Sequence, residues 1–188
     1  MTWPFAPLVP LAYSMLVLDP PWAFKTRTPK GWKKSPQAHY ACMTIEDICA
    51  LPVGQLAAPD CVLFLWATWP LLAEAQQAMG RWGFRYVSGG AWHKRTKNGC
   101  SAFGTGYRVR SSCEPFLIGV LGRPQTSRAH RNIIEGLARQ HSRKPEEAYA
   151  WCESYLPGAR RAEVFSRESR PGWEHWGNEA GKFDEVAA

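Results

Sequence analysis

The sequence predicts an α/β protein built on a parallel or mixed sheet with helices on both faces. Short apolar runs that indicate strands alternate along the chain with segments of helical periodicity. Most of these runs are continuously apolar, which is typical of strands buried on both faces of a sheet. The chain has 188 residues, of which 45% are hydrophobic, so it can bury a sizeable core. We expect residues 1–188 to form one domain.

The expected strands are short and end at turn signals. The first, residues 14–18, stops at Asp19-Pro20-Pro21, because proline lacks the backbone N–H that would continue a helix or a sheet ladder. The later expected strands are residues 61–66, 84–92, 115–121 and 162–165.

The expected helices cover residues 45–51, 71–82 and 145–156. Thr44, followed by an acidic residue at the third position, is a typical N-cap for the first helix. Gly83 is positioned to end the second helix and Ser142 to cap the third. The expected loops and turns are residues 25–40, 98–110 and 166–177.

The chain carries a formal charge of +7 at neutral pH, which favours a polyanionic partner. The positive charge is concentrated in two segments without any acidic residue, residues 23–38 and 93–112. Aromatic residues are interleaved with the Lys and Arg there, as on surfaces that bind single-stranded or extruded nucleic acid. Within the second segment, Lys94, Arg108 and Arg110 are candidate substrate contacts. The alternative is that both segments are solvated loops without a ligand.

Several classes of protein are disfavoured. No apolar run approaches the roughly 20 residues of a membrane-spanning helix, and the N-terminus lacks the basic start of a secretory signal. The six cysteines form no CxxC pair, and no histidine stands at zinc-finger spacing from them. We therefore expect a cytoplasmic protein with no structural metal, no disulfide framework and no membrane partner.

The first expected strand leads into Asp19-Pro20-Pro21-Trp22, at the edge of an α/β sheet where ligands commonly bind. The Asp19 carboxylate and the Pro20 carbonyl are two fixed acceptors, which suits a planar amine with two N–H groups. The indole of Trp22 offers a face on which a base can stack. These residues indicate chemistry on the exocyclic amine of a base. The alternative is a plain turn after a strand.

Over almost its whole length the chain resembles the Asp-Pro-Pro-Trp, or MT-A, family of adenine-N6 methyltransferases, and in particular its short bacterial and phage members. That family includes the catalytic subunit of eukaryotic mRNA adenosine methylation. Besides residues 19–22, the segments that carry the resemblance are residues 35–40, 43–44, 63–68, 103–107, 114–119, 141–146, 165–167, 170–173 and 176–179.

The resemblance implies a Rossmann-like methyltransferase fold, a three-layer sandwich with permuted motif order, in which the catalytic loop precedes the main cofactor-binding segment. It also implies S-adenosylmethionine as the cofactor and the N6 amine of adenine in nucleic acid as the methyl acceptor, with DNA favoured over RNA. The chain has no glycine-rich Phe-x-Gly-x-Gly loop. Cofactor binding is therefore expected to rest on side chains near the C-terminus.

The resemblance also assigns roles to individual residues by match of motif. The residues of the catalytic loop are Asp19, Pro20, Pro21 and Trp22. The residues matched to cofactor binding are Phe5, Lys144, Arg167, Asn178 and Glu179. The residues matched to the acceptor pocket are Tyr40 and Glu114. Lys144 is expected near the methionine end of the cofactor. Cys113 departs from the family pattern, because many bacterial and phage relatives carry histidine at that position.

Alternatives remain open for some of these residues and for the function. Glu114 can be a buried partner of Arg108 or Arg110, and Trp173 and Trp176 are expected to pack against the last strand. The same two acceptors at the catalytic loop would also suit the N4 amine of cytosine, and RNA adenosine is a further possible acceptor. A protein of a different class, a catalytically silent nucleic-acid-binding subunit, would bind nucleic acid but not S-adenosylmethionine.

Overall fold

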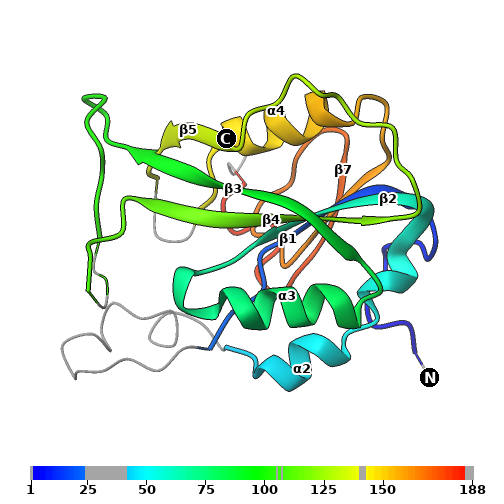
Figure 1. Cartoon of the computed structure of the whole chain (residues 1–188). Helices are drawn as coiled ribbons and strands as arrows, with labels where there is room; N and C mark the ends of the chain where they lie inside the picture. The colour runs from blue at the N-terminus through cyan, green and yellow to red at the C-terminus, as the bar shows by residue number, and fades with distance from the viewer. Residues whose placement is uncertain (1, 24–41, 105, 107, 140–142, 185–188) are drawn as a thin grey trace.

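The computed structural model describes residues 2–23, 42–104, 106, 108–139 and 143–184 (Figure 1). In these ranges a seven-stranded mixed sheet has the order β5-β3-β4-β2-β1-β6-β7. The strands are β1 (Tyr13–Leu18), β2 (Ala57–Trp66), β3 (Arg85–Arg95), β4 (Cys113–Leu121), β5 (Ile133–Leu137), β6 (Arg161–Val164) and β7 (Trp173–Trp176). β4 runs antiparallel to both β2 and β3, and the other neighbours are parallel. The expectation of a mixed sheet is confirmed.

Helices cover both faces of this sheet, which gives three layers (Figure 1). α2 (Ile45–Ala50) and α3 (Leu72–Arg81) lie side by side on one face, and α4 (Glu146–Tyr155) lies on the other. Short 3-10 helices over Val53–Leu56 and Trp69–Leu71 precede β2 and α3. The β1 side chains alternate between the two cores, with Leu16 packed on the α2–α3 side and Val17 on the α4 side. The three-layer arrangement confirms the predicted fold class.

The helix ends follow local sequence signals with one exception. The backbone N–H of Asp47 donates to Oγ1 of Thr44 at 3.1 Å, so Thr44 caps α2 as predicted. Gly83 lies just beyond α3 with φ at 87°, a left-handed conformation that favours glycine. The N-cap of α4 is Pro145 and not Ser142, which lies outside the described residues. Proline suits this place because the first N–H groups of a helix have no partner within it.

The two edge strands differ from the prediction. β5 is absent from the expected strands because it is short and its residues alternate between exposed and buried, as they do at a sheet edge. β7 lies inside residues 166–177, which were expected to form a turn. Trp173 is buried between β7 and α4, and Trp176 packs against the core. The packing role predicted for both tryptophans is confirmed.

Within the described part of the chain, no helix is both long and apolar enough to cross a bilayer.

Candidate active site

Charged side chains from distant parts of the chain meet at the carboxyl edge of the central strands. Asp19 directly follows β1, and its backbone N lies 3.5 Å from the carbonyl oxygen of Val164 at the end of β6. β4 runs antiparallel to β2, so its first residues, Glu114 among them, reach the same edge. Lys144 arrives from the segment that precedes α4. The sheet topology thus brings together three residues that the sequence predicts for the site.

Lys144 is the centre of an ion-pair network. Its ammonium lies 3.1 Å from Oδ2 of Asp19, contacts Oε1 of Glu114, and stands 5.0 Å from the centre of the Trp66 ring. The second oxygen of Glu114 lies 2.9 Å from Nζ of Lys94 on β3. Lys144 is only 6% exposed, and a buried charge is tolerated only with such partners. Acidic and basic side chains therefore alternate from the Asp-Pro-Pro-Trp loop to β3.

The pKa shifts follow from this alternation. Burial raises the pKa of Glu114, but the charges of Lys144 and Lys94 outweigh burial and lower it to about 2. Burial also raises the pKa of Asp19, and the neighbouring Glu114 carboxylate adds to that effect against the attraction of Lys144. For Lys144 burial favours the neutral form, yet the two carboxylates raise its pKa above the ordinary lysine value. Lys144 is consequently charged at every physiological pH.

The Asp-Pro-Pro-Trp loop is anchored to the core through its last residue. The indole N–H of Trp22 donates to the carbonyl of Trp66 at 3.1 Å, and the ring is only 5% exposed. This differs from the expected open stacking face, because the ring packs with the α2–α3 core. The Pro20 carbonyl accepts the backbone N–H of Trp22 at 2.8 Å. A carbonyl oxygen has two lone pairs, so Pro20 can still accept from a ligand.

A pocket with an empty volume of about 280 Å³ opens beside Asp19 and Lys144. Its remaining lining residues come from the start and body of α4, from β6 with its following turn, and from near the C-terminus: Arg143, Tyr149, Glu163, Phe165, Arg167, Glu168 and Phe183. Phe165 has φ at 69°, a left-handed conformation that is strained for an aromatic residue. Backbone strain of this kind clusters at ligand sites.

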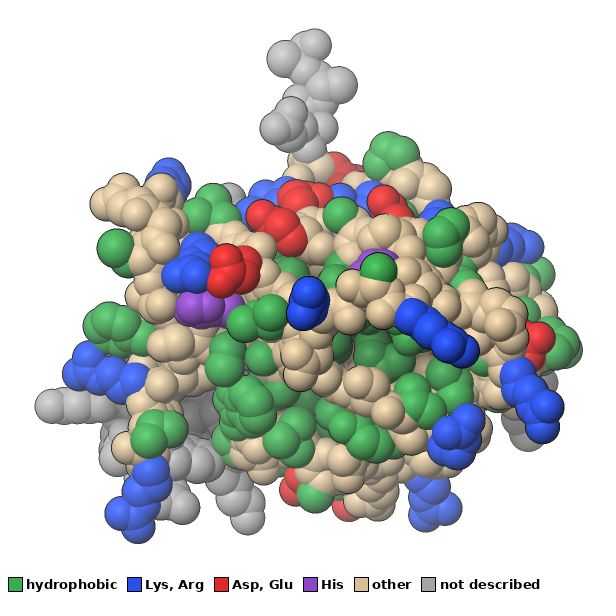
Figure 2. All heavy atoms as spheres, turned by 45° about the horizontal axis from the view of Figure 1, so that its top comes forward, with side chains coloured by type: hydrophobic (Ala, Val, Ile, Leu, Met, Phe, Trp, Pro, Cys, Tyr) green, Lys and Arg blue, Asp and Glu red, His purple; other side chains and the backbone are tan. Residues whose placement is uncertain are grey.

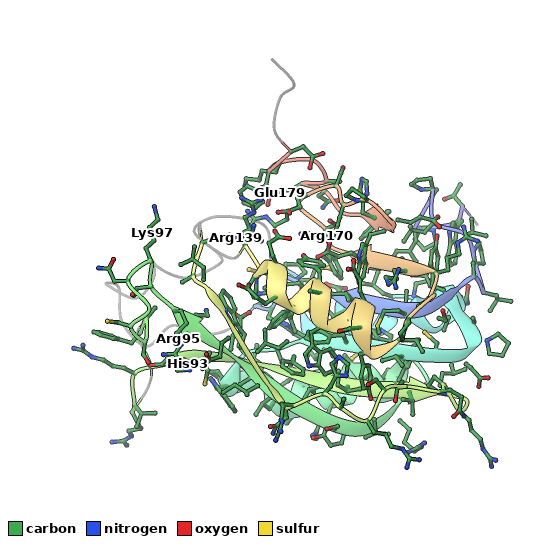
Figure 3. All side chains as sticks on the ribbon, turned by 90° about the horizontal axis from the view of Figure 1, so that it is seen from above. His93, Arg95, Lys97, Arg139, Arg170 and Glu179 are labelled. Atoms are coloured by element: carbon green, nitrogen blue, oxygen red, sulfur yellow. The ribbon has the colours of Figure 1, made fainter. Side chains whose placement is uncertain are left out.

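Two residues predicted for cofactor binding form an ion pair, and one of them, Arg167, lines this pocket. Nε of Arg167 lies 2.8 Å from Oε2 of Glu179, and Asn178 is exposed next to Glu179. Gly177 allows this segment to approach, since a Cβ there would lie 2.5 Å from the carbonyl oxygen of Ser166. Figure 3 shows Glu179 on the same side of α4 as Arg170.

Phe5, which the resemblance matches to cofactor binding, is not among the residues that line this pocket. Its side chain is completely buried, with its ring 5.5 Å from that of Trp3 and 5.1 Å from that of Trp176. The ring is therefore part of the core and packs against Trp176, which precedes Asn178 by two residues.

The residues predicted to contact substrate divide into two groups. Lys94 is held by Glu114, which corrects the alternative that pairs Glu114 with Arg108 or Arg110. Arg108 and Arg110 are exposed on the connection from β3 to β4, where the Arg110 guanidinium lies 5.0 Å from the centre of the Phe103 ring. Tyr40 lies outside the described residues.

The connection from β3 to β4 projects from the body of the protein. Lys and Arg side chains stand out along the left edge of Figure 2, the side on which this connection lies in Figure 1. Figure 3 shows His93 and Arg95 near the end of β3 and Lys97 beyond that end, on the connection to β4. The exposed end thus offers positive charge beside apolar surface, with Phe103 63% exposed and Val109 81% exposed.

Glu163 and Phe183 line the pocket, although neither is among the predicted site residues. The Phe183 ring lies 5.1 Å from the Arg143 guanidinium and 5.0 Å from that of Arg167. Glu163 is a lone carboxylate in the otherwise apolar end of β6, and that contrast is a signal that sequence reasoning can use. No sequence signal marks Phe183. Across the described ranges, no group of three or more His, Cys, Asp or Glu side chains is arranged to hold a metal ion.

The fold and the site together define an α/β protein of the Rossmann-like class, with a ligand pocket at the carboxyl edge of its central strands. A family model described as MT-A70 matches residues 13–179, and the chain belongs to this family of methyltransferases.

The chain is similar to relatives from bacteria, plants and animals. It is 27% identical to the type II methyltransferase M.MunI of Mycoplasma, with 89% of this chain and 77% of that protein covered. It is 28% identical to the human N(6)-adenine-specific methyltransferase METTL4, with 93% of this chain and 39% of that protein covered. It is also 28% identical to the N(6)-adenosine-methyltransferase MT-A70-like of Arabidopsis thaliana, with 89% of this chain covered. The chain spans only 24% of the length of that plant relative.

Proposed function

We propose that this chain transfers a methyl group from S-adenosylmethionine to the N6 amine of adenine in nucleic acid, with DNA as the favoured substrate. The observation that carries the proposal is the Asp19 carboxylate, which follows β1 in an intact Asp-Pro-Pro-Trp loop and lines the pocket. Relatives named as N6-adenine and N6-adenosine methyltransferases support adenine as the base. The match over most of a bacterial type II methyltransferase supports DNA.

The residues of the pocket fit S-adenosylmethionine. Carboxylates and cations stand close together on one wall, which suits the zwitterionic amino-acid end of the cofactor. Phe165 and Phe183 provide aromatic surface for the adenine ring, and the Arg167–Glu179 pair offers partners for ribose hydroxyls. The bound cofactor supplies an electrophilic methyl group on a sulfonium centre.

The catalytic loop positions the acceptor amine. In this proposal Asp19 accepts a hydrogen bond from one N–H of the amine, and the Pro20 carbonyl accepts from the other. Lys144 fixes the direction of the Asp19 carboxylate by holding Oδ2 at 3.1 Å. Asp19 also stabilises the positive charge that develops on the nitrogen, so its main contribution is orientation and electrostatics, with little demand for a strong base.

The exposed basic end of the β3–β4 connection is proposed to hold the nucleic acid. Arg108 and Arg110 can neutralise phosphates, while Phe103 and Val109 lie beside them as apolar contacts. A base in a duplex must leave the stack before its amine can reach a pocket, and surfaces of this composition assist that step.

The test is methyl transfer from labelled S-adenosylmethionine to single- and double-stranded DNA and RNA, followed by analysis of the modified nucleosides. We expect label in N6-methyladenine, with more in DNA than in RNA. Label mainly in RNA would correct the substrate, and label in N4-methylcytosine would correct the base. Binding of nucleic acid without cofactor binding or label would identify a silent subunit and contradict the proposal.

A further inference from the structure

Glu163 is a buried carboxylate in the pocket that also contains Asp19. It lies on β6 in register with Val17 of β1, one position before the end of the strand. The hydroxyl of Tyr149 on α4 donates to its Oε1 at 2.7 Å, and the hydroxyl of Ser166 lies 3.0 Å from its Oε2. Only 6% of Glu163 is exposed. The surrounding structure therefore fixes this carboxyl group in place at the pocket wall.

Glu163 differs from the other acids of the pocket in lacking a basic partner. Asp19 is paired with Lys144. Glu168 lies 2.7 Å from Nε of Arg143 and 2.8 Å from Nη2 of Arg170. Among the described residues, no Lys or Arg forms an ion pair with Glu163, whose hydrogen-bond partners are neutral hydroxyls.

The charged and titratable groups around Glu163 come from every element packed against it. These groups are Asp19 after β1, Tyr149 and Cys152 on α4, Arg170 in the turn after β6, and His175 on β7, which pairs in register with Glu163. The Arg170 guanidinium lies 3.7 Å above the Tyr149 ring and also binds Glu146 and Glu168, so its charge is shared. Figure 3 shows Arg170 beside Arg139 near the start of α4, and Glu146 contacts both.

Burial and the neighbouring Asp19 charge raise the pKa of Glu163 to about 7, against the hydroxyl hydrogen bonds and Arg170. Near neutral pH this carboxyl group is therefore about half protonated. A cation placed between Asp19 and Glu163 would relieve the repulsion between the two acids and favour their ionised forms.

We propose that the pocket binds the ammonium of an α-amino acid group between Asp19 and Glu163, and that Glu163 releases its proton to solvent as this ammonium binds. The inference rests on the proposed function, since the amino acid group is then the methionyl end of S-adenosylmethionine. It adds Glu163, which lies outside the segments that carry the family resemblance, as a binding residue, and it makes cofactor affinity depend on pH.

The expected pH dependence has a definite direction. Below pH 7 the ligand must displace a proton from Glu163, so affinity falls as the pH falls. Between pH 6 and pH 8 the affinity for a ligand with the ammonium should rise by about tenfold, while a ligand without it should show no such rise. Asp19 titrates in the same pocket, so replacing Glu163 alone is needed to identify the source.

The experiment uses isothermal titration calorimetry on the full chain with two probes. S-adenosylhomocysteine carries the amino acid group, and 5′-methylthioadenosine has the same nucleoside without it. Titrations near pH 7 in two buffers of different ionisation enthalpy give the number of protons released. We expect wild-type protein to release a fraction of a proton with S-adenosylhomocysteine and none with 5′-methylthioadenosine. Glu163→Gln should abolish the proton release, and it should weaken the binding of S-adenosylhomocysteine but not that of 5′-methylthioadenosine.

Glu168→Gln is the matched control, because Glu168 lines the same pocket but is already paired with two arginines. It should retain the proton release. Unchanged 5′-methylthioadenosine binding by Glu163→Gln shows that the variant is folded. If Glu163→Gln binds both probes more weakly by the same factor, or if it still releases a proton, this inference is overturned and the proposed function is unaffected. If wild-type protein binds neither probe, the proposed function fails together with it.

Discussion

Nζ of Lys144 and Oδ2 of Asp19 lie 3.1 Å apart, although the Asp-Pro-Pro-Trp loop and the segment before α4 are far apart in the sequence. Through Glu114 the same ammonium is linked to Lys94 on β3, the strand that leads into the exposed basic connection. The orientation of the proposed catalytic carboxylate therefore depends on β4 and β3 as well as on its own loop. Mutations in this network should change catalysis without direct contact with substrate.

Lys144→Met should reduce kcat by about 100-fold, because it removes the cation that orients and ionises Asp19 while preserving most of the side-chain volume. The Asp19 pKa should rise further, so the remaining activity should shift to higher pH. The measurement is kcat against pH for wild type, Lys144→Met and Lys144→Arg. An unchanged pH profile in Lys144→Met would contradict the positioning role.

Glu114→Gln should lower the free energy of unfolding by about 3 kcal/mol, because it leaves the buried Lys144 charge with one partner fewer. Urea denaturation at pH 7 measures this decrease. Glu135→Gln is the control, since Glu135 is an exposed partner of Arg95 and its replacement should change the midpoint little. A similar decrease in both variants would show that burial of the network is unimportant.

Acid should remove the stabilisation that Glu114 provides. Its pKa is about 2 in the folded protein against an ordinary value of 4.5, so its contribution is fully present above pH 4.5 and disappears as the pH falls towards 2. Denaturation curves between pH 5 and pH 2.5 should show a steeper decline for wild type than for Glu114→Gln. Parallel declines would assign the acid sensitivity to other carboxyl groups.

Glu163 should have the opposite effect on stability. Its pKa is about 7 in the folded protein, so the folded state holds a proton that the unfolded state has already released above pH 4.5. The free energy of unfolding should therefore decrease as the pH rises from 4.5 to 7. Glu163→Gln should flatten this part of the curve, and a wild-type slope in the variant would rule out Glu163 as its source.

Replacing Arg108 and Arg110 together by alanine should weaken nucleic-acid binding and reduce its dependence on salt, by about one unit of the log–log slope for each phosphate that the variant no longer neutralises. Binding of S-adenosylhomocysteine should be unchanged, because both arginines lie on the exposed connection outside the pocket. Arg81→Ala on α3 is the matched control. If wild type, the double variant and Arg81→Ala show the same salt dependence of binding, the nucleic acid binds on another part of the surface.

The central strands and the position of the Asp-Pro-Pro-Trp loop could be predicted from sequence because their signals are local. A continuous apolar run marks β1, and two prolines mark its end. The edge strands β5 and β7 could not be predicted, since each depends on pairing with one neighbour more than on its own composition. The same holds for the site. Asp19 follows a local motif, whereas the partners of Lys144 depend on where an antiparallel strand begins.

Asp19→Asn tests the central claim most directly, because it preserves the size of the side chain and removes only its charge. The measurement is N6-methyladenine formed in DNA by wild type and variant, with 5′-methylthioadenosine binding as the check on the fold. We expect the wild type to form the product and the variant to be slower by at least about 100-fold while still binding the nucleoside part of the cofactor. Product formation at the wild-type rate by Asp19→Asn would contradict the assignment of Asp19 as the catalytic carboxylate.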